Sequence, residues 1–206
     1  MTQTVFLMSE VFRQEGWSDY LESLGNVEFL DFTGLEGTSC YCSEDAMNEI
    51  WDTLTEADPQ GRVRWIDTGD YHYLSAINYL SLEDTDNLIL IDNHPDNFQY
   101  EDILSCGNWM TYIDRFKPLC ASETHPAYLS VDLDILSPDY FRTNWDQGSM
   151  TLEELFNLIR AIAVTKGISD VDICGGLTRS KGAVEEDLEL NFNTRKQLME
   201  FLNKLL

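Results

Sequence analysis

The chain has 206 residues, of which 43% are hydrophobic, and it contains five tryptophans. This is enough to bury the core of one domain, which we expect to span residues 1–206. The formal net charge of −24 argues against nucleic acids and anionic membranes as partners, because their phosphates would be repelled. It favours cations, either metal ions or positively charged small molecules, although surface solubility accounts for most of the 37 acidic residues.

The chain opening and the apolar runs predict a cytoplasmic protein. No apolar run approaches the roughly 20 residues that cross a bilayer. The opening MTQTVFLMSE has no basic residue ahead of its short apolar stretch, which argues against a signal peptide. The five cysteines form no CxxC pair, so we expect reduced thiols.

Short apolar runs alternate with amphipathic segments along the chain. The apolar runs predict buried strands at 4–8, 27–32, 63–66, 88–91, 128–131 and 171–174. The amphipathic segments predict helices at about 17–24, 44–56, 71–81, 151–165 and 194–205. Ser43 suits a helix N-cap, and Thr151 with Glu154 matches a capping box. This alternation predicts an α/β fold of three layers, α-β-α, with a mostly parallel sheet.

Polar side chains that suit metal binding follow the predicted strand 88–91. In open parallel sheets the ligand site lies beyond the carboxyl ends of the strands. Here the sequence continues as Asp92-Asn-His94-Pro-Asp96, and these alternating positions share one face if the strand continues. Two carboxylates and an imidazole aimed the same way form a mixed oxygen and nitrogen ligand set.

Two further strand ends add three candidates. The strand 128–131 is followed by Asp132-Leu-Asp134, in which the aspartates alternate with apolar residues. The segment after 63–66 ends in His72, at a strand-to-helix turn. An Asp-x-Asp pair is also a common turn or cap device, and a single histidine is often core or surface filler. The chain has only three histidines, however, and two stand at strand ends near clustered aspartates, which favours metal ligands.

Charge balance supports this interpretation. Two carboxylates about 4 Å apart repel by roughly 4 kcal/mol at an effective dielectric constant of about 20. A protein whose stability is about 5–15 kcal/mol can hardly hold four converging aspartates ionised. Either raised pKa values keep some of them protonated, or two divalent cations balance the four charges. The second explanation is the simpler one.

These elements, in this order, resemble the ureohydrolase superfamily of arginase, agmatinase and formiminoglutamase. The matching segments are GDYH (69–72), DNHPD (92–96) and SVDLDILSP (130–138), and QGSMTLEEL (147–155) is similar to the family's GGLT-x-x-E segment. The resemblance is clearest over residues 60–165. It implies an arginase-like fold in a short, divergent member of the group.

The resemblance also implies two divalent metal ions, usually manganese. One metal ion would be held by His72, Asp92, Asp96 and Asp132, and the other by His94, Asp92, Asp132 and Asp134. Asp92 and Asp132 would therefore bridge the two ions and carry the catalysis. In this family a hydroxide between the metal ions attacks an sp² carbon, which cleaves a linear C–N bond.

Two family features are replaced in this chain. In SCGNWMT (105–111), Met110 occupies the place at which the family has a histidine that moves protons. Near 172–176 this chain has glycines, whereas the family has a glutamate that binds the guanidinium group of the substrate. His125 is a candidate for the missing acid or base, with an ordinary loop histidine as the alternative. Asn108 and Trp109 are candidates for the wall of the substrate cavity. Glu186, or its neighbour Glu185 or Glu189, could replace the missing glutamate. Arg179 and Lys181 are candidates for binding an anionic group of the substrate. Cys40, Tyr41 and Cys42 either line the pocket or belong to a packed loop.

Three functions remain open. The first is a metal-dependent hydrolase that cleaves a guanidino, formimino or amide compound, with arginase or agmatinase activity itself disfavoured by the two replacements. The second is a catalytically inactive metal-binding protein of the same fold with a regulatory or assembly role. The third is a phosphoester hydrolase of unrelated fold, disfavoured by the scarcity of positive charge. We expect a small-molecule substrate, and the sequence leaves open whether the chain forms a homo-oligomer.

Overall fold

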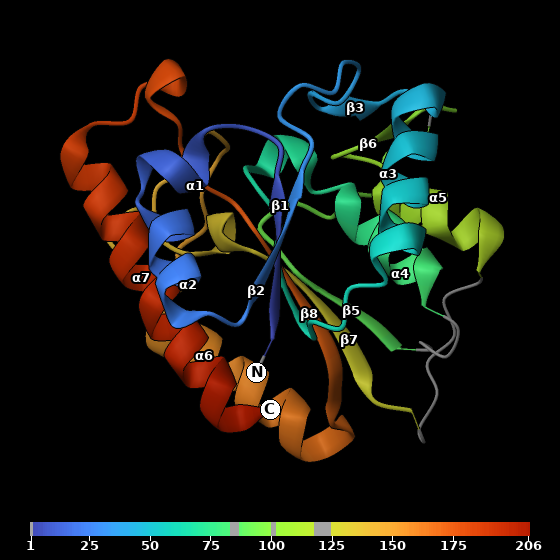
Figure 1. Ribbon diagram of the computed structural model, residues 1–206. Helices are drawn as coiled ribbons and strands as arrows, with labels where there is room; N and C mark the ends of the chain where they lie inside the picture. Colours follow the sequence, from blue (N-terminus) through green and yellow to red (C-terminus); the bar gives the residue numbers. More distant parts are fainter. Residues whose placement is uncertain (1, 83–86, 100–101, 118–124) are drawn as a thin grey trace.

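A six-stranded parallel sheet divides the molecule (Figure 1). The computed structural model describes residues 2–82, 87–99, 102–117 and 125–206. The strand order is β2-β1-β4-β8-β7-β5. The strands are β1 (Gln3–Leu7), β2 (Val27–Asp31), β4 (Val63–Trp65), β5 (Asn87–Ile91), β7 (Ala127–Asp132) and β8 (Ile168–Cys174). Because every pairing is parallel, all six carboxyl ends meet at one edge of the sheet.

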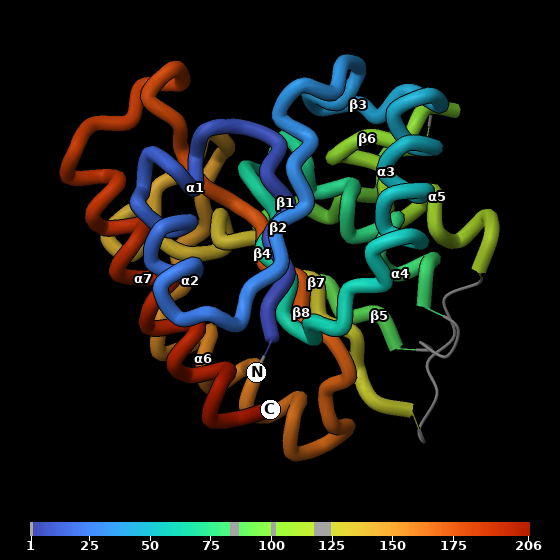
Figure 2. The backbone as a smooth tube through the Cα atoms, in the orientation of Figure 1, coloured from blue at the N-terminus to red at the C-terminus, as the bar shows by residue number. Residues whose placement is uncertain are grey.

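Helices cover both faces of the sheet, so the predicted three-layer α-β-α fold is confirmed. One face carries α1 (Val11–Gln14), α2 (Trp17–Leu24), α6 (Leu152–Lys166) and α7 (Glu185–Leu205). The other carries α3 (Glu44–Ala57), α4 (Leu74–Ser81) and α5 (Trp109–Phe116). The two chain ends lie close together at the amino-terminal edge of the sheet (Figure 2). Among the helices in the described ranges, none has both the length and the apolar character to cross a membrane.

Short elements stand over the carboxyl-terminal edge. A two-stranded antiparallel sheet pairs β3 (Tyr41–Cys42) with β6 (Leu104–Ser105), and Figure 1 shows it above that edge. Three 3₁₀ turns follow strands of the main sheet: η1 (Gly69–Tyr71), η2 (Leu133–Ile135) and η3 (Arg179–Lys181). The chain segments that follow the strands therefore cover the carboxyl ends of the strands, and we call this covering layer the roof.

Each face of the sheet has its own apolar core. In β1, Val5 packs into one core while Phe6 packs into the other, because successive side chains of a strand point to opposite faces. Trp65 and Ile66 divide in the same way at the end of β4. Strands that are covered on both faces need apolar residues at successive positions, which is why they appear in the sequence as unbroken apolar runs.

The six predicted strands are all present, and the predicted helix caps are confirmed. The hydroxyl of Ser43 accepts a hydrogen bond from the backbone N–H of Ala46. Thr151 and Glu154 form the reciprocal capping box at the start of α6. Four features were not predicted: the short helix α1, α5, the β3–β6 pair, and the first turns of α7, which was expected only from 194.

A buried ion pair joins α7 to the rest of the fold. The guanidinium of Arg195 donates from Nε to Glu15 Oε2 at 2.6 Å and from Nη2 to the carbonyl of Gly175 at 2.5 Å, and both charged side chains are buried. Burial raises the pKa of Glu15, and the Arg195 charge opposes that shift. The pair therefore connects the residues after α1, the carboxyl end of β8 and the middle of α7.

We expect Arg195→Met to lower the free energy of unfolding by about 3–5 kcal/mol, because it leaves Glu15 buried without its partner. Denaturant unfolding would measure the loss. The matched control is Arg13→Met, which removes an exposed pair with Glu10 and should cost less than about 1 kcal/mol. The double variant Glu15→Leu/Arg195→Met should recover most of the loss. An Arg195→Met protein as stable as the parent would contradict the role given to the pair.

Candidate metal centre

Three carboxylates converge on the imidazole of His72. This residue follows η1, which the chain forms directly after β4. Its Nδ1 lies 3.2 Å from Asp92 Oδ2, 3.1 Å from Asp96 Oδ2 and 3.5 Å from Asp132 Oδ2. The aspartates come from the ends of β5 and β7, so three strand ends meet in one buried cluster.

A second group forms around His94 at the end of β5. Its Nδ1 lies 2.8 Å from Asp134 Oδ2 and 3.6 Å from Asp92 Oδ1. Asp92 therefore directs one carboxylate oxygen towards each histidine, as expected for a bridging ligand. Asp132 directs Oδ2 towards His72, while its Oδ1 accepts the backbone N–H of Asp134 at 2.9 Å. Its predicted contact with the second metal ion stays a prediction.

Neighbouring side chains fix the orientation of the first group. His72 Nε2 lies 2.8 Å from the hydroxyl of Ser130, which in turn contacts Ser75 at 2.9 Å. The indole N–H of Trp109 donates to Asp96 Oδ2 at 2.5 Å. Asp96 also has a positive φ of 45°, a strained conformation for a residue with a side chain. These contacts hold Nδ1 of the imidazole and the carboxylate of Asp96 towards each other.

The pKa values show how much charge is packed into the cluster. Burial alone would lower the pKa of His72, but hydrogen bonds to Asp92 and Asp96 raise it well above its ordinary value. Burial and the charges of Asp132 and Asp92 raise the pKa of Asp134 to about 9. Burial, with the charge of Asp92, raises the pKa of Asp132 to about 6. Without other cations, the cluster therefore holds protons at neutral pH.

The donor set fits divalent cations better than it fits protons. Asp92 Oδ2 is buried, and apart from His72 Nδ1 at 3.2 Å it has no partner within the described part of the chain. A buried carboxylate oxygen is costly unless a cation lies beside it. Three compact groups of the described residues could hold an ion: His72 with Asp92 and Asp96, His94 with Asp92 and Asp134, and His72 with Asp132 and the buried thiol of Cys174. The oxygen and imidazole ligands suit hard or borderline divalent ions. The six residues therefore match a two-metal site with Asp92 in common.

The cluster forms the floor of a cavity of about 420 Å³. Its walls include the exposed aromatic rings of Tyr41, Phe98 and Trp145, together with Cys40 and Cys106. Of these wall residues, sequence reasoning singled out only the segment 40–42. Phe98 and Trp145 lie in irregular segments without periodicity or motif, so no sequence signal pointed to them. Cys106 lies in the segment SCGNWMT (105–111), in which only Met110 and the candidates Asn108 and Trp109 were singled out.

Because Gly69 has no side chain, Trp145 in the cavity wall can lie close to Asp132 on the cavity floor. A Cβ at this position would lie 2.7 Å from Trp145 Cδ1 and 3.4 Å from Asp132 Oδ2, and the first distance is too short. The indole N–H of Trp145 donates to Asp70 Oδ1 at 3.1 Å, and the amide of Asn144 donates to the same oxygen at 2.9 Å. Asp70 thus fixes the loop that carries Trp145 beside the cluster of candidate metal ligands.

Two of the predicted wall residues have structural tasks. Asn108 lines the cavity, but its amide accepts from the N–H of Ser105 and donates to the carbonyl of Ile103, which closes the turn before α5. Trp109 is buried beneath the cavity and orients Asp96, as described above. The prediction that Trp109 contacts substrate is therefore replaced by a role in positioning a metal ligand.

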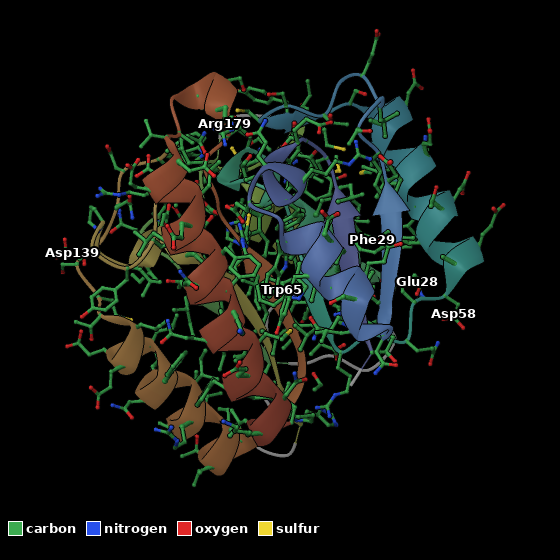
Figure 3. All side chains as sticks on the ribbon, turned by 60° about the vertical axis from the view of Figure 1, so that its left-hand side comes forward. Glu28, Phe29, Asp58, Trp65, Asp139 and Arg179 are labelled. Carbon is green, nitrogen blue, oxygen red and sulfur yellow. The ribbon has the colours of Figure 1, made fainter. Side chains whose placement is uncertain are left out.

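Three other predicted residues do not reach the cavity. His125 precedes β7, whereas Asp132 ends it, so the two lie about 20 Å apart along the strand. Arg179 lies at the top of the molecule in Figure 3, forms an ion pair with Glu185 and is not among the residues that line the cavity. Glu186 is exposed in the first turn of α7. A catalytic role for His125 and substrate contacts by Arg179 or Glu186 are therefore not retained.

Comparisons with known proteins bear on the fold of the chain. No protein-family model matches the chain. An uncharacterised protein of Thermotoga maritima is 30% identical over 141 residues, in a match that covers 55% of this chain and 57% of the relative. The chain thus spans little more than half the length of that relative.

Solved structures match over nearly the whole chain. Proclavaminate amidino hydrolase from Streptomyces clavuligerus has a TM-score of 0.68 and 9% identity, with 99% of this chain and 91% of that chain covered. Arginase from Bacillus subtilis has a TM-score of 0.67 and 10% identity, with 98% of each chain covered. Formimidoylglutamase from Bacillus subtilis has a TM-score of 0.61 and 11% identity, with 97% and 85% covered.

These matches define the class of fold. The chain has the arginase-like α/β fold of the ureohydrolases, which confirms the fold expected from the resemblance. At these identities the matches concern the fold alone, so the metals and the chemistry of this chain depend on its own residues.

The bridging geometry predicts different metal contents for different variants. We expect Asp92→Ala to lose both metal ions, because each histidine group shares this carboxylate, whereas His72→Ala should lose mainly one. Metal analysis by mass spectrometry after loading with Mn²⁺ and desalting would measure this. The matched control is Asp70→Asn, a buried aspartate next to the cavity that belongs to neither group, and it should keep both ions. Equal metal content in all three variants would contradict a shared ligand.

The raised pKa values predict how the stability of the metal-free protein depends on pH. The folded state binds protons at Asp134 and His72 more tightly than the unfolded chain does. The contribution of these protons to the free energy of unfolding is therefore present at low pH and is lost as the pH rises. We expect the midpoint temperature of unfolding of the metal-free protein to decrease as the pH rises from about 6 to about 9. Saturation with Mn²⁺ should raise the midpoint and flatten the decline, because the ions replace the protons.

Asp134→Asn tests the cause of that decline. An amide does not titrate in this range, so the metal-free variant should lose less stability with pH than the metal-free parent. A midpoint of the metal-free parent that rises over the same pH range would show that these groups do not hold protons in the folded state.

Proposed function

We propose that the chain is a two-metal hydrolase that cleaves a C–N bond in a small guanidino, formimino or amide compound. The observation that carries this proposal is the position of Asp92 between the two histidine groups, on the floor of a cavity open to solvent. A site that served only to stabilise the fold would be closed around its ions. Here His94 keeps 34% of its side-chain surface exposed.

The metal ions would be held by His72, Asp92, Asp96 and Asp132 on one side and by His94, Asp92, Asp132 and Asp134 on the other. Manganese is our proposed identity, because carboxylate oxygens dominate the set and suit hard ions. When bound, such a pair lowers the pKa of a water molecule and stabilises negative charge that develops on the substrate. The protein's own task is to hold these ligands in place, which Ser130 and Trp109 do for the His72 group.

The cavity walls favour a neutral or positively charged substrate. Among the described residues that line the cavity there is no lysine or arginine. The aromatic side chains of Tyr41, Phe98 and Trp145 surround the mouth, and aromatic faces attract organic cations. The net charge of −24 adds a long-range attraction for cations. A substrate with a carboxylate or phosphate tail would find no positively charged side chain among these described wall residues.

Met110 supports a second candidate function. It occupies the place of a proton-moving histidine in the resemblance, and here it packs against the core on the α3–α5 face. Besides the six proposed ligands, the titratable side chains found in the described cavity wall are Cys40, Tyr41 and Cys106. A metal-binding protein without turnover, used in regulation or assembly, is therefore the alternative.

A substrate screen distinguishes the two. Protein loaded with Mn²⁺ would be incubated with a panel of guanidino, formimino and amide compounds, and released urea, ammonia or amine would be measured. We expect turnover of at least one neutral or cationic compound. Asp134→Asn should lower kcat/KM by more than about 100-fold, because even residues behind the ligands contribute about 10–100-fold in such sites.

The control for this screen is Asp139→Asn, an exposed aspartate remote from the cavity that Figure 3 shows at the molecular surface. It should match the parent in rate and metal content. A parent protein that binds two ions and releases no product from any compound would contradict the hydrolase and favour the alternative.

A further inference from the structure

Two cysteines that are remote in sequence face each other in the cavity wall. Cys40 precedes β3 and Cys106 follows β6, and these two strands pair with Tyr41 opposite Ser105 and Cys42 opposite Leu104. Continuing this antiparallel register places Cys40 opposite Cys106. The backbone N–H of Cys106 donates to the carbonyl of Cys40 at 2.9 Å, which confirms that the pairing extends to them.

The side chains of the two cysteines lie near each other, because each thiol shifts the pKa of the other. Directly opposed residues in an antiparallel pair have Cβ atoms about 4.5–5.5 Å apart, and a disulfide needs about 3.5–4.5 Å with Cα atoms about 4.4–6.8 Å apart. A small adjustment of the strands therefore brings the two sulfur atoms within bonding distance.

The backbone holds Cys40 in this position from both sides. Its N–H donates to the carbonyl of Asp70 at 3.1 Å, and its carbonyl accepts the N–H of Cys106. Cys40 has a positive φ of 60°, a conformation that is unfavourable for a residue with a side chain. The surrounding hydrogen bonds thus hold the backbone of Cys40 in this conformation beside the backbone of Cys106.

Both thiols are within reach of small molecules. Cys40 and Cys106 are half-buried and line the cavity. Cys42 and Cys174 are buried instead, and Cys120 lies outside the described residues. Among the described cysteines, the two that face each other are therefore also the two that meet the solvent of the cavity.

We propose that Cys40 and Cys106 are a reversible dithiol site, which a low-molecular-weight disulfide such as oxidised glutathione converts into a cross-strand disulfide. One cysteine attacks the glutathione disulfide, forms a mixed disulfide and releases the first glutathione thiol. The second cysteine attacks the protein sulfur of that mixed disulfide and releases the second glutathione thiol. The protein loses two hydrogen atoms, and these end on the two glutathione molecules.

The bond joins the two loops that form one wall of the cavity. Residues before β3 and after β6 then move as a single unit beside Phe98, which lies against Gly107. The redox state of this pair therefore adjusts the shape of the cavity wall. The inference does not depend on whether the metal cluster below turns over a substrate.

Disulfide mapping tests the proposal. Reduced, folded protein would be equilibrated with excess oxidised glutathione at mildly alkaline pH, because burial and the charge of Asp70 raise the pKa of the Cys40 thiol and slow its reaction. Free thiols would then be alkylated and the unreduced digest analysed by mass spectrometry. We expect a peptide pair linked through Cys40 and Cys106, and a higher thermal midpoint for the oxidised protein.

Single variants provide the controls. In Cys40→Ser and Cys106→Ser the linked pair should be absent, the remaining thiol of the site should carry glutathione, and oxidation should no longer raise the thermal midpoint. Cys42→Ala removes the neighbouring buried cysteine and should leave the link intact. The proposal is overturned if both thiols of the parent remain free at equilibrium, if they carry glutathione without joining, or if either joins a different cysteine.

Discussion

Electrostatic repulsion among four aspartates is the constraint on which the architecture of this molecule depends. Asp92, Asp96, Asp132 and Asp134 meet at one edge of the sheet, and His72 and His94 stand among them. Buried carboxylates at such distances are held only with positive charge close by, from protons or from metal ions. The raised pKa values of Asp132 and Asp134, and the approach of His72 Nδ1 to the buried Oδ2 of Asp92, both follow from this requirement.

The scaffold meets this requirement by fixing each strand end with buried polar contacts. The carboxylate of Asp67 accepts hydrogen bonds from the backbone of Met8, Ser9 and Thr68, which ties the end of β1 to the end of β4. Arg195 binds the carbonyl of Gly175 after β8. Neither residue belongs to the His72 or His94 group, yet both hold strand ends in the positions from which the side chains of these groups converge. Rigid support of this kind is what a metal site needs to hold a defined geometry.

The roof above the cluster is built differently from the floor. The floor consists of side chains on strand ends and adjoining turns, whereas the roof consists of irregular segments held by single contacts, such as the bond from Trp145 to Asp70 and the short β3–β6 pair. A rigid floor combined with adjustable walls is the arrangement in which loops set substrate choice while the scaffold supplies the chemistry. The cross-strand cysteines belong to this adjustable part.

The sequence by itself determined the sheet, most of the helices and all six proposed ligands. Strands covered on both faces leave unbroken apolar runs, and ligands at strand ends leave alternating polar residues directly after them, so both signals are local. The start of α7 left no such signal, because its inner face carries the polar residues Asn191, Thr194 and Arg195, which interrupt the apolar periodicity. Partners remote in the chain make these residues suitable for burial: Glu15 and Arg142 for Asn191, the carbonyl of Tyr140 for Thr194, and Glu15 and Gly175 for Arg195.

Only the tertiary structure decided which residues share the cavity. It placed His125 at the opposite end of β7, turned Trp109 into a support for Asp96, and brought Trp145 and the Cys40–Cys106 pair to the walls. The physical reason is that a residue's distance from the metal cluster depends on strand order and loop path. These are long-range properties of the fold, and no periodicity within a short segment encodes them.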